Sequence, residues 1–192
     1  ELTASTFGQG DTGNIKITAT GDVLFDGSKD GVSSGVFNGV EGAIAIRKGG
    51  EIEINARNLS ITNGGALSTG SLFGNGNGGS IFVNTNNLTL NNNAIIESIS
   101  LAGIGGDINI TTKGYLLIRN NSSIQTDSLS SDKNGNGGNI IINSPLIIAT
   151  PGNNDISANA SAGNGGKLKI TSQGLFGIQY RPKGQESPLT ND

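Results

Sequence analysis

The residues of this chain that could carry out catalysis or bind a metal are almost all carboxylates. The chain contains 15 Asp and Glu but no Cys and no His. Thiolate chemistry, disulfides, and the commonest general base and metal ligand are therefore excluded. The carboxylates that could contribute to a site are Asp11, Asp22, Asp26, Asp30, Glu41, Glu51, Glu53, Glu97, Asp107, Asp127, Asp132 and Asp155.

Enzymes that cleave polysaccharides need paired carboxylates, and these must converge on one face. Glu51 and Glu53 alternate outward along one run, and Asp107 occupies the Glu51 position two repeats later. Without His and without repeated Asp pairs, solvated outward positions are the simpler interpretation of these residues. We therefore predict no catalytic residue, no cofactor and no enzyme activity, and we keep a β-helix carbohydrate-active enzyme as an alternative.

Other ligand chemistries have little support in the sequence. Repeated Ca²⁺ sites of the nonapeptide type need Gly-Gly-x-Gly-x-Asp, whereas here an Asp follows the glycines only at Asp107. An isolated Ca²⁺ site between Asp26 and Asp30 stays open. A P-loop is excluded because no Lys-Ser/Thr pair and no helix follows the glycines. The net charge of −3, without a basic block, argues against nucleic acid as a partner.

The carboxylates must be positioned by a chain of unusual composition. Glycine accounts for 32 of 192 residues, aromatic residues for 4% and charged residues for 14%. The apolar residues are mostly Ile, Leu and Val in short patterned runs, which argues against disorder. No run has the length of a membrane span.

A Gly-x-apolar-x-apolar signal recurs six times, as in "GGSIFVN" and "GGNIIIN". Its starts lie 27 to 37 residues apart, which identifies a repeat rather than a scattered motif. The starts are at Gly13, Gly50, Gly79, Gly106, Gly138 and Gly166.

Each repeat contains three short alternating runs separated by Gly, Asn or Ser, the pattern of three β-strands. Three strands in about 30 residues are typical of one coil of a parallel β-helix, with coils about 4.8 Å apart. We therefore predict one all-β domain over residues 1–192, a right-handed single-stranded parallel β-helix of about six coils. A β-sandwich is the main competitor, but it would show two-residue hairpin turns and a Greek-key order.

Alternation then predicts which residues face the core. First runs contribute Ile15, Ile17, Ile52, Ile54, Ile81, Val83, Ile108, Ile110, Ile140, Ile142, Leu168 and Ile170. Second runs contribute Val23, Phe25, Leu59, Ile61, Leu88, Leu90, Leu116 and Ile118, and third runs contribute Leu67, Ile95, Ile124 and Ile156. Phe82 should point outward between Ile81 and Val83.

Turn residues fall into two predicted sets. The start glycines Gly50, Gly79, Gly106, Gly138 and Gly166 should allow a tight turn, with positive φ expected at the Gly78–Gly79 step. A ladder of side-chain amides is predicted where "NN" recurs before the third run. Its members would be Asn92, Asn93, Asn120, Asn121, Asn153 and Asn154. Two stretches interrupt the plan: residues 26–48, expected to hold an extra loop or a distorted third strand, and a polar bulge at 127–136.

The stretch from Gly135 to Ile178, "GNGGNIIINSPLIIATPGNNDISANASAGNGGKLKITSQGLFGI", resembles repeats of filamentous-haemagglutinin-type large exoproteins, cyanobacterial ones above all. The resemblance extends over essentially the whole chain. It implies a right-handed parallel β-helix, export by two-partner secretion through an outer-membrane transporter, and a location outside the cell or on its surface. The roles it implies are adhesion, aggregation or haemagglutination.

One feature departs from that family. Its secretion-recognition domain carries Asn-Pro-Asn-Leu motifs, and the four prolines here form no such motif. We therefore expect a shaft segment, a fragment of a longer exoprotein whose transporter-binding region is not in this chain. Alternatives are an extracellular filament or matrix subunit that stacks end to end, and the carbohydrate-active enzyme. Cell-surface carbohydrate and other exoprotein chains are the remaining candidate partners.

Overall fold

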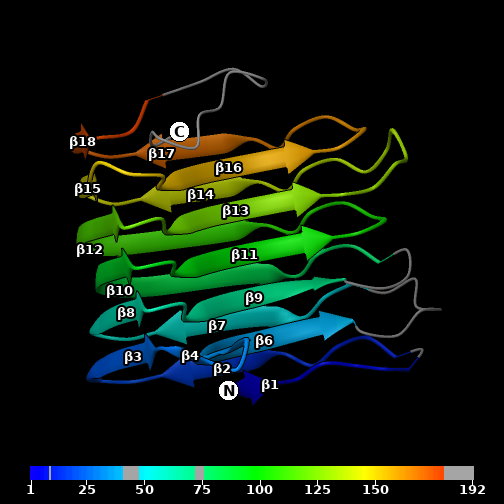
Figure 1. The fold of residues 1–192 in the computed structure, drawn as a ribbon, viewed down its shortest axis with the longest axis horizontal. Helices are drawn as coiled ribbons and strands as arrows, with labels where there is room; N and C mark the ends of the chain where they lie inside the picture. Colours follow the sequence, from blue (N-terminus) through cyan, green and yellow to red (C-terminus); the bar gives the residue numbers. More distant parts are fainter. Residues whose placement is uncertain (9, 41–47, 72–75, 180–192) are drawn as a thin grey trace.

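The computed structural model describes residues 1–8, 10–40, 48–71 and 76–179. The described residues form strands throughout and no helix, so none of them belongs to a helix that could span a membrane. Figure 1 shows the strands stacked as successive layers, from β1–β3 at one end to β16–β18 at the other. Glu41, one of the candidate carboxylates, lies outside the described residues.

One sheet, called the long sheet here, collects the first and second runs of every repeat. Its first-run strands are β2 (Ile15–Thr18), β7 (Glu51–Asn55), β10 (Ser80–Asn91), β12 (Ile108–Arg119), β14 (Ile140–Asn143) and β17 (Leu168–Thr171). Its second-run strands are β3 (Asp22–Asp26), β8 (Asn58–Thr62), β15 (Leu146–Ala149) and β18 (Gly174–Phe176). In the two middle repeats both runs belong to one strand, β10 or β12, so the prediction of three short strands in every coil is wrong there.

The second sheet, called the short sheet here, collects the third runs in the order β1-β6-β9-β11-β13-β16. Its strands are β1 (Leu2–Thr3), β6 (Gly35–Val40), β9 (Ala66–Ser71), β11 (Ile95–Ser100), β13 (Ser123–Ser128) and β16 (Asp155–Ala160). Each coil therefore passes along the long sheet and returns along the short sheet.

All pairing within these two sheets is parallel and joins equivalent residues of successive repeats. Ile81 pairs with Ile52 on one side and with Ile108 on the other. The same register places the six glycine starts in one column, which encloses five complete turns. The parallel β-helix predicted from the repeat is confirmed.

The interior is built from columns of aliphatic side chains, and in the middle coils the predicted core residues other than Ile95 are fully buried. The prediction fails at the ends, where Leu168 is 43% exposed and Ile15, Ile17, Val23 and Ile170 are only partly buried. Among the described residues, a terminal coil has a neighbouring coil on one side only, so its inward side chains pack against one coil instead of two.

The prediction of Ile95 as a core residue is wrong, because Ile96 pairs with Leu67 and Ile124 and is the buried one. The turn before β11 has the same length as in both neighbouring coils, so Ile95 pairs with Ala66 and Ser123 and faces outward.

The corner between the two runs of the long sheet is lined by small hydroxyl residues. Thr85 donates to the Asn87 carbonyl, and the hydroxyls of Thr112 and Ser144 lie 2.6 Å apart. The pairing register shifts between Thr85 and Asn87, because Gly114 is an extra residue in the next coil. Buried hydroxyls thus satisfy backbone groups that the bend leaves without ladder partners.

The long first repeat is explained by a hairpin inserted before its third strand. β4 (Ser28–Lys29) and β5 (Val32–Ser33) pair antiparallel around Asp30 and Gly31, both with positive φ. β6 then follows with regular pairing, so within residues 26–40 the interruption is an extra loop and not a distorted third strand. Residues 41–47 of the predicted interruption lie outside the described residues. At the predicted 127–136 bulge, β13 extends through Ser128 and only the following residues leave the sheet.

Candidate functional site

The glycines at the coil starts form a column at the edge of the long sheet. A Cβ on Gly50, Gly79, Gly106, Gly138 or Gly166 would overlap the carbonyl oxygen of the preceding glycine in the column. None of these five glycines has positive φ, and neither does Gly78. The expected positive φ is therefore wrong, and the glycines are required because successive backbones approach too closely for any side chain.

A column of polar side chains in the short sheet faces the glycine column across the interior. It consists of Asn38, Thr69, Ser98 and Thr126, each at most 1% exposed. We call this set the hydroxyl column, although its first member is an amide. Ser98 donates to the Gly79 carbonyl at 2.8 Å and accepts from the Gly106 amide at 3.1 Å. Thr126 donates to the Gly138 carbonyl at 2.8 Å.

Two further sets of contacts hold the turns that precede the glycine column. Ser100 donates to the Gly76 carbonyl and accepts from the Gly103 amide, and Ser128 donates to the Gly103 carbonyl. Asn77 accepts the backbone amide of Ile104 in the next coil at 2.9 Å. The Gly-Asn-Gly-Gly motif therefore supplies close approach through its glycines and coil-to-coil acceptors through its asparagine.

The predicted amide ladder lies in the turns that connect the two sheets. Asn92, Asn93, Asn120 and Asn121 all have φ near +60°, the left-handed region that Asn tolerates better than most residues. These turns stack, because the Asn93 amide donates to the Asn120 carbonyl at 2.9 Å. The side-chain amides are offset: Asn92 donates to Asn63, and Asn120 donates to Asn91.

Asn153 and Asn154 do not take the positions predicted for them. The Asp155–Ser123 pairing places Asn153 beside Asn121 and Asn154 beside Ser122. Pro151–Gly152 makes this turn one residue longer, which shifts both asparagines. Asn154 is fully buried, donates to the Thr150 carbonyl and accepts the Ser122 amide.

Clear side-chain ladders occur instead on the outer face of the long sheet. Asn87 donates to Asn58 at 2.9 Å, and Asn58 donates to Asp22 at 2.8 Å. A second ladder joins Asn84 to Asn55 at 3.1 Å. A ladder with one residue per coil arranges its amides in a row along the rod axis, so they do not converge on a single binding site.

Three carboxylates of this outer face, Asp22, Asp26 and Glu53, have hydrogen-bond partners that favour the charged form. The Arg57 guanidinium, aided by Asn58, lowers the pKa of Asp22, and the Arg57 pKa rises in turn. Hydrogen bonds from Thr62 and Asn63 lower the pKa of Asp26. Lys16, 2.9 Å away, and Asn55 lower the pKa of Glu53. These groups act as exposed acceptors for neighbouring coils.

On the outer face of the short sheet, the carboxylate pKa values shift in the opposite direction. Burial raises the pKa of Glu97, although Ser68 and Gln125 donate to its oxygens at 2.8 and 3.3 Å. Burial also raises the pKa of Asp127, although Asn159 donates to it. Asp127 adds a smaller repulsion that further raises the Glu97 pKa. A raised carboxyl pKa suits a general acid. However, neither Glu97 nor Asp127 lines the surface hollow beside the inserted hairpin or the one beside Gly50.

The remaining carboxylates are dispersed along the rod. Asp107 accepts the Asn139 amide in the next coil at 2.9 Å, and the register places Glu51, Ser80 and Asp107 in one column, as predicted. Asp132 accepts the Asn134 amide within its own turn. No cluster of three or more potential metal-ligand residues occurs in the described parts of the chain, and this includes the Asp26–Asp30 region.

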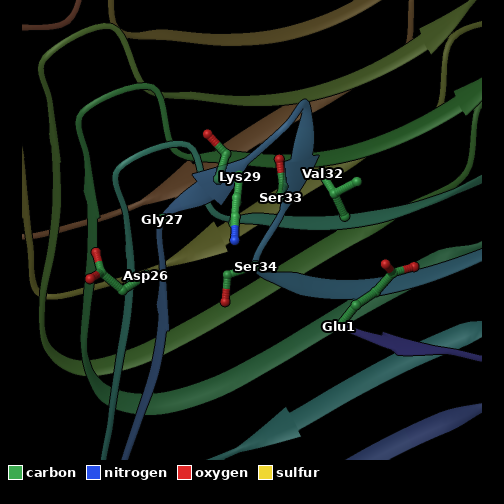
Figure 2. A pocket seen from close by; sticks show the side chains of 8 residues that line it. Glu1, Asp26, Gly27, Lys29, Val32, Ser33 and Ser34 are labelled. Atoms are coloured by element: carbon green, nitrogen blue, oxygen red, sulfur yellow. The ribbon is translucent and has the colours of Figure 1, made fainter.

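Surface hollows of the described part of the rod include two near its N-terminal coils. One, of about 320 Å³, is bounded by the inserted hairpin, and Figure 2 shows Lys29 between Asp26 and Glu1. The other, of about 290 Å³, adjoins Gly50 and Glu51. Both are open and lined mainly by short polar side chains. Phe82, the outward aromatic predicted from alternation, is half-buried between Glu53 and Asn109 in the neighbouring coils.

No family model, curated protein or solved structure matches this chain. The residues themselves therefore carry the functional argument. The hydroxyl column was missed from the sequence, although a signal exists: the same third-run position is Asn, Thr, Ser and Thr in four successive repeats. That position was overlooked because alternation predicts an apolar residue wherever a strand faces the core.

Proposed function

We propose that this chain is a rigid shaft segment of a secreted or cell-surface exoprotein, of the adhesive filamentous-haemagglutinin type. The observation that carries the proposal is the one-to-one stacking of equivalent residues through five turns. A stack of this kind extends along one axis by adding coils, each of which contacts only its neighbours.

The outer surface supports a spacer role. Its polar groups lie in axial ladders, such as Asp22–Asn58–Asn87, and its ion pairs join adjacent coils, as Lys16 joins Glu53. Such groups tie one coil to the next and offer repeated amides to a neighbouring chain or a surface carbohydrate. The proposal assigns no catalytic step to the chain. Export would use a two-partner outer-membrane transporter that recognises another region of the exoprotein.

Lengthening the rod by one coil tests the spacer role. Duplicating residues 79–105 adds one repeat that begins and ends at the glycine column. A shaft should remain folded and lengthen by about 4.8 Å per added coil, measured by small-angle X-ray scattering. Aggregation, unfolding or an unchanged longest dimension would contradict a modular shaft. Binding of chain-coated beads to cells or polysaccharide, compared with uncoated beads, tests the adhesive part separately.

A further inference from the structure

Three Asn-Gly steps occupy equivalent places in the turns before the glycine column. They are Asn77–Gly78, Asn136–Gly137 and Asn164–Gly165. An Asn-Gly step is the dipeptide most prone to spontaneous deamidation, because glycine leaves its backbone nitrogen unshielded. The reaction needs a free glycine nitrogen and an asparagine side chain that can rotate toward it.

Stacking engages both reacting groups at the first two steps. The Gly78 nitrogen donates to the Ile104 carbonyl at 2.8 Å, and the Asn77 side-chain oxygen accepts the Ile104 amide at 2.9 Å. The Gly137 nitrogen donates to the Asn164 carbonyl at 2.9 Å, and the Asn136 side-chain oxygen accepts the Asn164 amide at 2.9 Å. In each case the next coil holds both the nucleophile and the electrophile.

The third step differs on both counts. Asn164 and Gly165 are both exposed. Within residues 1–8, 10–40, 48–71 and 76–179, the Gly165 nitrogen and the Asn164 side-chain amide make no hydrogen bond. The Asn164 backbone is nevertheless fixed, because its N–H and carbonyl both bond to the preceding coil.

We propose that Asn164, on whose turn no described coil stacks, is a site of spontaneous deamidation, whereas Asn77 and Asn136 are protected by the coil that stacks on them. The deprotonated Gly165 nitrogen attacks Cγ of Asn164 and expels the side-chain nitrogen as ammonia, giving a cyclic imide. Water then opens either imide C–N bond and yields aspartate or isoaspartate. The overall reaction is hydrolysis of an amide, with water consumed, ammonia released and no redox change.

The extent of deamidation at Asn164 would therefore report whether another coil or a second copy stacks on this turn. The modification adds a carboxylate close to Lys167, and isoaspartate also adds a methylene to the main chain at the column edge. A further coil or a second copy stacked on the turn would hold Gly165 as Asn164 holds Gly137.

The test is to incubate the full chain at neutral pH and 37 °C and follow each Asn-Gly step by peptide mass spectrometry. Asn164 should deamidate about tenfold faster than Asn77 and Asn136, the factor expected from one or two net hydrogen bonds. Asn63–Gly64 is a further protected control, because the Gly64 nitrogen donates to the Asn92 carbonyl at 2.8 Å. The N164Q variant should lose the fast phase.

A denatured sample separates the effect of the fold from that of local sequence. In concentrated urea the three steps should react at similar rates, since stacking is lost. The proposal is overturned if Asn77 or Asn136 reacts as fast as Asn164 in the folded chain. It is equally overturned if the same difference between the steps persists in urea.

Discussion

The two sheets show the same alternation of inward and outward side chains, but their inward side chains differ in polarity. In the middle coils of the long sheet the inward columns are Ile, Leu and Val at first- and second-run positions. In the short sheet one aliphatic column is followed by the hydroxyl column, which forms hydrogen bonds with backbone groups of the column glycines. The inward face of the long sheet is therefore held by apolar packing, whereas the inward face of the short sheet also forms hydrogen bonds with the main chain.

The outer faces differ in a related way. On the long sheet, Asp22, Asp26 and Glu53 accept hydrogen bonds from cationic, amide or hydroxyl partners, which lower their pKa values. Glu97 and Asp127 on the short sheet are desolvated and have raised pKa values. The comparison shows that solvent access differs between the two outer faces, although both belong to one repeated coil.

The largest expected effect comes from breaking the close approach between the glycines at the edge of the long sheet. Gly106→Ala places a Cβ on the Gly79 carbonyl, and backbone cannot yield there without separating two coils. We expect the free energy of unfolding to fall by about 3 kcal/mol, the upper part of the range for overpacked sites. Urea denaturation followed by circular dichroism measures this loss.

Gly13→Ala is the matched control in the same column. A Cβ there meets only the Ala4 side chain, at 3.7 Å. Its effect should stay within about 0.5 kcal/mol. Equal losses for the two variants would show that the column does not require close approach.

Removing one hydroxyl tests the chemistry of the short-sheet interior. Thr126→Val keeps the side-chain volume but leaves the buried Gly138 carbonyl without its donor. The expected loss in the free energy of unfolding is about 1.5 kcal/mol, from urea midpoints. Thr111→Val, the same change at an exposed long-sheet position, should have little effect, and a comparable loss there would remove the distinction between the sheets.

The turns that join the two sheets should respond to backbone conformation. Asn92 has a φ of 57°, which alanine adopts at a cost of roughly 1 kcal/mol. Asn92→Ala should lower the free energy of unfolding by about that amount, while Asn92→Gly should recover most of it. If glycine is as harmful as alanine in thermal unfolding, the side-chain bond to Asn63 matters more than φ.

The smallest effect is a difference in the pH dependence of stability. A raised folded-state pKa means that native Glu97 binds more proton than the unfolded chain, so stability falls as pH rises above the ordinary value of 4.5. Glu97→Gln should remove the contribution of Glu97 to this pH dependence of the free energy of unfolding. The slope of that contribution is less than the slope for one bound proton. Glu53 has a lowered pKa, so it stabilises above its unfolded pKa and loses this contribution as pH falls through its folded pKa.

Urea midpoints measured from mildly acidic to neutral pH distinguish these two signs. Glu97→Gln should gain stability relative to wild type toward neutral pH, and Glu53→Gln should lose it. The same sign for both variants would contradict the contrast between the outer faces.

The repeated glycine starts allowed the fold and the pairing register to be predicted from sequence, because each start marks the same backbone position in its coil. The side-chain chemistry of the third run was harder to predict. Ile95 and Ile96 are both apolar, so alternation alone does not show which one faces the core, whereas the register places Ile96 beside Leu67 and Ile124. The role of Gly106 was also missed, since close approach to Gly79 depends on a residue 27 positions away.

The parallel stacking of equivalent residues is the basis of the whole account, and NMR contacts between coils test it most directly. Close backbone proton contacts are expected between Gly79 and Gly106 and between Gly106 and Gly138, with the same pattern along β10 and β12. Antiparallel contacts between β10 and β11, as in a hairpin-built sandwich, would contradict the stacked coil and the shaft function that depends on it.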